Sequence, residues 1–91
     1  MIHTKHHVEC GRDVDIKKRD QIEAALEQRF PTEASAQFWF RLTPLQIGVW
    51  LLTIHGVGGH DFEIVGCGCE TVQLEDVLKS AEKLAARWGS R

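Results

Sequence analysis

The sequence has no apolar run long enough to cross a membrane and no marked excess of charge of either sign. Its longest apolar stretch, Ile47 to Ile54, is far below the roughly 20 residues of a membrane-spanning helix. Lysine and arginine number 11 against 13 aspartates and glutamates, for a net charge of −2 with neutral histidines. A protein that binds nucleic acid mainly by neutralising phosphates usually has a basic excess. We therefore expect no membrane partner, and no affinity for nucleic acid that depends on an overall positive charge.

Cysteine is scarce, and its number is odd. The three cysteines are Cys10, Cys67 and Cys69, a count that argues against a disulfide framework. The start of the chain, residues 1–10, is polar and rich in histidine, without the apolar run behind a basic start that marks a signal peptide. A cytoplasmic protein with reduced thiols is the simplest interpretation.

What the sequence does contain is typical of one globular domain. With 91 residues there is too little chain for a second core. Hydrophobic residues make up 43% and charged residues 26% of the chain, so disorder is not expected. We predict a single soluble domain over residues 1–91, in which residues 1–12 form an irregular lead-in or a short edge strand.

Two segments have apolar residues at helical spacing. The first begins behind Asp13 or Asp15, either of which could cap it, and Pro31 ends it because proline has no N–H to donate. The second has acidic residues in its first turn and a basic residue in its last, which favours the helix dipole. The stripe of the first helix is Val14, Ile22, Ala25, Leu26 and Phe30. The stripe of the second is Val77, Leu78, Ala81, Leu84, Ala85 and Trp88.

Between these helices the apolar period changes to two, which is typical of strands. The expected strands are 37–43, 47–55 and 62–65, separated by a turn at 44–46 and a glycine-rich loop at 56–61. This order predicts an α+β fold, α-β-β-β-α, with a three-stranded antiparallel sheet and both helices packed on one of its faces.

The middle strand is apolar on both of its faces, as in a strand that is covered on both sides. If Trp50 and its neighbours at i±2 pack under the helices, then Val49 and Leu51 point away from them. Trp39, on the preceding strand, likewise points away from the helices. The lead-in, a second copy of the chain or a partner protein could cover this face. An exposed apolar patch usually marks an interface.

A group of histidines and cysteines provides one candidate metal site. Imidazole and thiolate are the ligands that zinc prefers. The spacing matches no standard zinc motif, because it contains no C-x-x-C pair, and we expect a polar start and two small thiols without a metal. A small zinc-stabilised module is an alternative. Its candidate ligands are His3, His6, His7, Cys10, Cys67 and Cys69.

No set of residues in the sequence predicts catalysis or cofactor binding. Cys67 or Cys69 could serve as a nucleophile, with His60-Asp61 as its base. The nearby acids, however, disfavour a reactive thiolate. The glycines at 56–59 are not followed by the helix and the lysine of a phosphate-binding loop. We therefore expect a protein that is not an enzyme and has no cofactor.

The predicted order of helix, three strands and helix is also that of double-stranded-RNA-binding domains, so nucleic acid is an alternative ligand. In that family the last helix begins with lysines that contact phosphates. The corresponding segment here, Thr71–Asp76, contains Glu75 and Asp76, and no lysine follows before Lys79. The similarity is one of topology alone, and no residue is carried over from it. Sheet aromatics could stack bases, but Arg41 is the only cation among them.

These observations predict a small non-catalytic module that binds another protein through a hydrophobic sheet face. The expected partner is another protein or a second copy of the chain, with nucleic acid less favoured. Such a chain would suit a homodimeric accessory protein or an inhibitor encoded by a phage or another mobile element. The contact surface is expected on the strands that carry Trp39 and Trp50, beside the glycine-rich loop. Its residues are Trp39, Arg41, Val49, Leu51 and His60.

Overall fold

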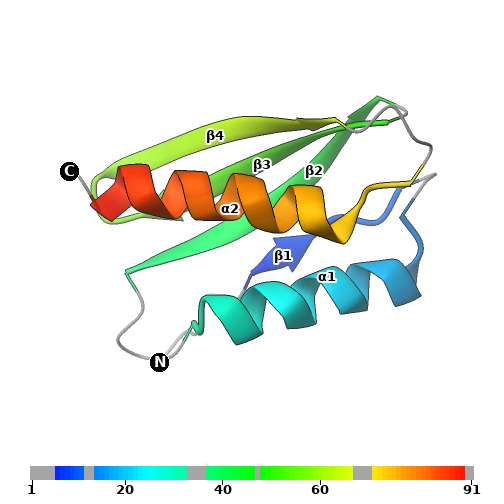
Figure 1. The fold of residues 1–91 in the computed structure, drawn as a ribbon, viewed down its shortest axis with the longest axis horizontal. Helices are drawn as coiled ribbons and strands as arrows, with labels where there is room; N and C mark the ends of the chain where they lie inside the picture. Colours follow the sequence, from blue (N-terminus) through cyan, green and yellow to red (C-terminus); the bar gives the residue numbers. More distant parts are fainter. Residues whose placement is uncertain (1–5, 12–13, 33–36, 47, 67–70, 90–91) are drawn as a thin grey trace.

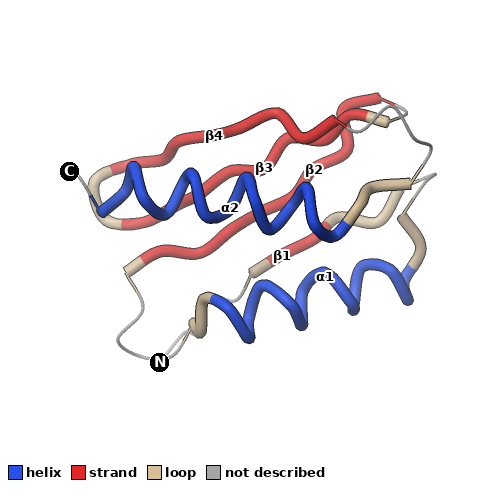
Figure 2. The backbone as a smooth tube through the Cα atoms, in the orientation of Figure 1, coloured by secondary structure: helices blue, strands red, loops and turns tan. Residues whose placement is uncertain are grey.

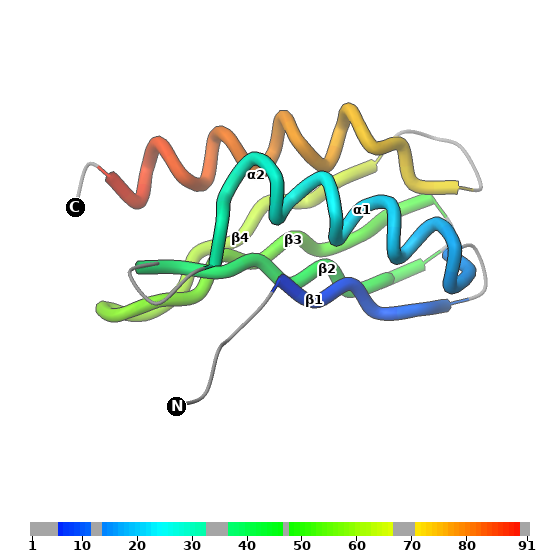
Figure 3. Tube along the Cα trace, turned by 90° about the horizontal axis from the view of Figure 1, so that it is seen from below, coloured from blue at the N-terminus to red at the C-terminus, as the bar shows by residue number. Residues whose placement is uncertain are grey.

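The computed structural model describes residues 6–11, 14–32, 37–46, 48–66 and 71–89 of the chain. Its elements follow in the order β1 (His7–Val8), α1 (Ile16–Arg29), β2 (Phe38–Gln46), β3 (Val49–Gly56), β4 (Gly59–Gly66) and α2 (Leu74–Gly89). Both helices lie on the same face of the sheet, as Figure 1 and, from a second direction, Figure 3 show. The fold is therefore a two-layer α+β arrangement, which confirms the predicted class.

The sheet has four strands in the order β1-β2-β3-β4, so the prediction of three antiparallel strands is wrong in this detail. β2, β3 and β4 form an antiparallel meander, whereas β1 pairs in parallel with β2 through His7 with Arg41 and Val8 with Leu42. Figure 2 shows β1 beside β2, with α1 connecting the two strands. A strand of two residues is too short for its period to be recognised, which explains why the sequence indicated only a lead-in or an edge strand.

β2 continues through the segment that was expected to form a turn. It extends to Gln46, and Pro44 is paired with Trp50 of β3. The register shifts between Pro44 and Gln46, which marks a β-bulge at Leu45. Proline is tolerated at a bulge because the ladder does not need its missing N–H there. The predicted turn at 44–46 is therefore wrong.

β3 and β4 form a tight hairpin in place of the predicted loop at 56–61. Only Val57 and Gly58 lie in the turn, and β4 already begins at Gly59. Gly58 and Gly59 have φ angles of 102° and 118°, a backbone conformation that favours glycine. Glycines and polar residues in this segment are typical of a loop, and only the register with β3 shows that His60 is paired, opposite His55.

The helices begin and end close to the predicted positions. Asp15 is the N-cap of α1, where its carboxylate accepts a hydrogen bond from the N–H of Lys18 at 2.8 Å. At the other end the N–H of Phe30 donates to the carbonyl of Leu26 at 2.7 Å, directly before the proline that stops the helix. α2 begins at Leu74 and has the predicted acidic first turn and basic last turn.

The core lies between the helices and the sheet face that they cover. α2 packs over β3 and β4, and α1 packs beside β1. Buried residues alternate with half-buried ones along β3, as expected for a strand with only one face in the core. No helix in the described part of the chain is long and apolar enough to cross a membrane. The largest buried side chains are Trp50, Phe40, Ile22, Leu26, Leu42, Leu52, Ile54 and Leu84.

Candidate functional site

The candidate site is the face of the sheet that points away from both helices, which we call the open face. The alternation of buried and half-buried residues along β3 extends to β2 and β4 through the cross-strand register. Among the elements that the structure describes, none lies over this face (Figure 3). On β2, β3 and β4 the open face consists of Trp39, Arg41, Thr43, Val49, Leu51, Thr53, His55, His60, Phe62 and Ile64.

One end of the open face is apolar. Leu51 of β3 is directly opposite Ile64 of β4, and Val49 lies two residues before Leu51 on the same side of the strand. Ile64 is 52% exposed and Phe62 is 55% exposed, although both side chains are large and apolar. At the β2 bulge that borders this end, Leu45 is 53% exposed. These side chains form a contiguous patch of the kind that marks an interface.

Between Asp61 and Ile64, β4 has the reverse of the usual polarity for a strand in a two-layer fold, whereas Val65 is buried in the core. Phe62 and Ile64 point to the open face, whereas Asp61 and Glu63 lie on the helix side, opposite buried residues of β3. Arg87, in the last turn of α2, compensates both acids: its Nε is 3.4 Å from Asp61 Oδ2 and its Nη2 is 2.9 Å from Glu63 Oε1. Apolar residues of a half-exposed strand normally point to the core. The inversion leaves two large apolar side chains on the open face, where none of the described elements covers them.

The hairpin end of the open face carries a row of three rings. Trp39 and His55 are cross-strand partners, and their rings stack with centroids 4.4 Å apart and planes inclined by 18°. His60 is the partner of His55 on the other side, with ring centroids 5.9 Å apart. Burial lowers the pKa of His55, and the positive charges of His60 and Arg41 lower this pKa further because they disfavour a neighbouring imidazolium. His55 is therefore neutral at pH 7.

The permanent charge on the open face is compensated within the chain. Arg41 is the only arginine, lysine or carboxylate among the open-face residues of β2, β3 and β4. It forms an ion pair with Glu9, the residue that follows β1. The charge of Arg41 on the open face is therefore balanced within the chain.

The structure places all of the predicted contact residues on the open face. They are Trp39, Arg41, Val49, Leu51 and His60. Trp50, the second tryptophan of the expected surface, is instead fully buried under the helices, because it lies on the core side of β3. The role of the five exposed residues in binding a partner stays a prediction.

Five residues of the open face were not predicted as contacts, namely Thr43, Thr53, His55, Phe62 and Ile64. The period of two was visible in β4, but the two faces of a strand are equivalent until its register is known. The usual rule, that apolar residues of a half-exposed strand point to the core, would have turned Phe62 and Ile64 inward. Only the pairing of Leu51 with Ile64 shows that they point the other way.

At the two outer edges of the sheet, side chains form hydrogen bonds with backbone groups that an added strand would need. On β4 the N–H of Phe62 donates to Asp61 Oδ1 at 2.9 Å, and its carbonyl accepts from Arg87 Nη2 at 3.3 Å. On β1 the N–H of Val8 donates to Glu23 Oε2 at 2.9 Å. Natural sheets protect their edges against further pairing in this way. The open face is thus a more accessible surface for a partner than either edge.

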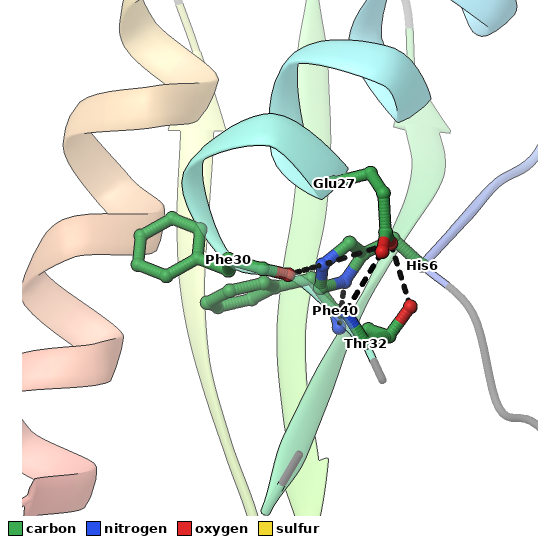
Figure 4. Close-up of polar contacts among 5 residues, drawn as sticks. All are labelled: His6, Glu27, Phe30, Thr32 and Phe40. Atoms are coloured by element: carbon green, nitrogen blue, oxygen red, sulfur yellow. Dashed lines mark hydrogen bonds and ion pairs between the residues drawn. The ribbon is translucent and has the colours of Figure 1, made fainter. Parts of the chain in front are cut away.

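His6, a candidate zinc ligand, is a buried structural residue (Figure 4). Its Nδ1 accepts a hydrogen bond from the N–H of Phe40 at 2.9 Å. Nε2 therefore carries the proton and donates it to the carbonyl of Phe30 at 2.6 Å. Both ring nitrogens are engaged with the backbone, so His6 has no lone pair left for a metal and does not fit the zinc alternative.

The surroundings of His6 favour the neutral imidazole. Burial lowers its pKa, which outweighs the opposite effects of the Phe30 carbonyl and of the carboxylates of Glu27 and Glu23. Glu27 lies 3.9 Å from His6 Nε2 and accepts hydrogen bonds from the N–H and the hydroxyl of Thr32, at 2.8 and 2.6 Å. Figure 4 shows this network joining the lead-in, the end of α1 and the start of β2.

The remaining metal candidates are not brought together by the described part of the fold. His7 and Cys10 are exposed, on and after β1. His3, Cys67 and Cys69 lie outside the described residues. Within those residues, no three histidines, cysteines or acids are grouped so that they could hold a metal ion.

Comparison with known proteins gives no match, whether to family models, to curated proteins or to solved structures. The functional argument therefore rests on the geometry and chemistry of the open face.

Proposed function

We propose that this protein is a small non-catalytic module that binds another protein through the open face. The inverted polarity of β4 carries the proposal, because it exposes Phe62 and Ile64 while two acids face the helix layer. Burying a side chain of this size that is half exposed contributes roughly 1 kcal/mol. Together with Leu51 and Val49, these two residues supply the apolar centre of an interface, and Arg41 supplies part of its polar rim.

The ring row supports the proposal by offering a rigid anchor. Trp39 is held against His55 by stacking, so it loses little conformational freedom when a partner covers it. Tryptophan is also among the residues that most often dominate the binding energy of interfaces. The apolar patch and the ring row lie on the same face, so one partner could contact both.

A nucleic-acid ligand has less support. The first turn of α2 contains Glu75 and Asp76, which would repel phosphates. Arg41 is already paired with Glu9. A surface that stacks bases normally combines its aromatic rings with cations along the strand. We therefore favour a protein partner and treat nucleic acid as an outcome to be tested.

Capture of partners from a native lysate tests the proposal. Ile64→Lys places a charge in the apolar patch, so we expect this variant to lose the proteins that the wild-type chain captures. Ile16→Lys is the matched control, because it makes the same substitution at an isoleucine 64% exposed at the start of α1, in the helix layer. Substitution of Trp50 is unsuitable, since this core residue is needed for folding.

Each captured protein is then purified and its binding to the three chains measured, after circular dichroism has shown that all three are folded. Equal binding by the wild type and the Ile64→Lys variant would contradict an interface at the open face. Binding of duplex RNA or DNA that weakens steeply with salt would instead support the nucleic-acid alternative.

A further inference from the structure

The charges of the open face allow it to meet a copy of itself. In a twofold-symmetric contact each copy presents the same surface, so an uncompensated charge near the axis faces its own kind. Here Arg41 is compensated by Glu9 within each chain, and His55 is neutral at pH 7. Two open faces can therefore approach without net repulsion.

The shape of the open face also fits a second copy. Identical sheets have the same right-handed twist, and two such sheets stack with their strands inclined by about −30° and about 10 Å apart. Exposed side chains such as Phe62 and Ile64 are long enough to fill that space from both sides. A partner of another fold would need a surface of matching twist to do the same.

We propose that a second copy of this chain occupies the open face, which gives a symmetric dimer with two sheets inside and the helices outside. The inference rests on the proposed function, because it names the partner of the same surface. It excludes a dimer built by strand addition, since side chains already occupy the N–H of Val8 and the N–H and carbonyl of Phe62.

The area of the open face is sufficient for a reversible dimer. β3 and β4 each have 8 residues, and β2 has 9. At about 3.3 Å per residue and about 4.8 Å between strands, three such strands cover roughly 26 Å by 14 Å. Two faces of this size total roughly 700 Å², which is the size of a weak, transient interface. We therefore expect a dimer that dissociates readily.

Sedimentation equilibrium of the purified chain, from about 1 to 500 μM, tests the dimer. The apparent mass is expected to rise with concentration from that of one 10.3 kDa chain towards twice that value. Ile64→Lys should raise the dissociation constant at least about tenfold. Ile16→Lys, with the same added charge on the helix layer, should dimerise like the wild type.

A wild-type chain that stays monomeric at the highest concentration overturns the dimer, and so does a dimer that Ile64→Lys leaves unchanged. Lysate capture separates this failure from that of the proposed function. A monomeric chain whose captured partners are lost with Ile64→Lys would show that another protein occupies the open face. A monomer whose captured partners are unaffected by Ile64→Lys would contradict both proposals.

Discussion

At the level of single residues, His6 joins three segments that are far apart in the sequence. The N–H of Phe40 can only donate, so Nδ1 of His6 must be the unprotonated nitrogen. An imidazolium would place a second N–H against that donor and break the contact. Glu27 and Glu23 favour the charged form, but burial outweighs them. The native fold therefore requires a neutral His6.

We expect His6 to make the stability of the fold depend on pH below its ordinary pKa of 6.5. Because folding lowers the pKa, His6 is neutral in both states above this pH and its contribution is complete. As the pH falls further the unfolded chain binds the proton first, and the free energy of unfolding decreases until the folded pKa is reached.

Urea unfolding of the wild type and of His6→Leu measures this effect. At about pH 7.5 the variant should lose roughly 1–3 kcal/mol, because the N–H of Phe40 is left without an acceptor. At about pH 5.5 the difference between the two chains should be smaller. Other titrating groups cancel in this comparison, and an equal difference at both pH values would argue against the role of His6.

Gly56 is needed for close packing at the end of β3. A Cβ atom at this position would lie 2.3 Å from the carbonyl oxygen of Gln37 and 2.7 Å from Cζ2 of Trp88. Gly56→Ala should therefore destabilise the fold by about 2 kcal/mol or more, as overpacking does. Gly58→Ala is the comparison, because it meets no atom within 4 Å and adds only the strain of a φ of 102°, about 1 kcal/mol.

Thermal unfolding of the two alanine variants compares the cost of a steric clash at Gly56 with the cost of backbone strain at Gly58. The melting temperature of Gly56→Ala should be clearly lower than that of Gly58→Ala. The opposite order would mean that β3 and α2 can separate at this point without loss of stability.

At the level of elements, α2 closes the edge of β4 as well as covering the core. Arg87 joins the carbonyl of Phe62 to the carboxylates of Asp61 and Glu63, while Asp61 accepts the N–H of Phe62. All of these groups are partly exposed, so the contribution of each ion pair to stability is small, about 0.2–1 kcal/mol. Their larger effect is to occupy backbone groups that would otherwise pair with another strand.

Removal of both Asp61 and Arg87 should open this edge. We expect the chain with Asp61→Ala and Arg87→Ala to form assemblies larger than a dimer, measured by light scattering. The matched control is Arg29→Ala with Glu82→Ala, which likewise removes one basic and one acidic side chain, but from an ion pair that joins the two helices away from the edge. Equal association of both double variants would show that charge loss alone, and not the freed edge, is responsible.

At the level of the whole molecule, protonation of His55 should separate two open faces that meet at neutral pH. His55 lies between Trp39 and His60, and near Arg41, whose charge is balanced by Glu9. A symmetric contact would place the His55 rings of both copies in one interface. The contact would bury His55 further and lower its pKa below that of the single chain, so a fall in pH favours the separated chains.

Apparent mass at a fixed concentration, measured from about pH 7.5 to 5.5, tests this consequence of the proposed dimer. The mass of the wild type should fall towards that of one chain as the pH decreases. A chain with His55→Gln should remain a dimer over the same range. Equal dissociation of both chains would assign the pH dependence to other groups.

Local periodicity was sufficient to predict most of the elements and part of the candidate site. Side chains four residues apart share a helix face whatever surrounds them, so Ile22 and Leu26 indicated the buried side of α1. Alternation along β3 likewise separated Trp50 from Val49 and Leu51, which located the open face. The turn at 44–46 failed because proline is common in turns, whereas here it pairs in a bulge.

What the sequence by itself determined is thus the order of the helices, the three longer strands and the apolar excess on β3. Tertiary structure decided the features that join distant residues: the parallel pairing of β1, the two backbone bonds of His6 and the closed edge of β4. It also decided that Phe62 and Ile64 face outward, because a shift of the register by one residue exchanges the faces of a strand. A local period contains no information about that register.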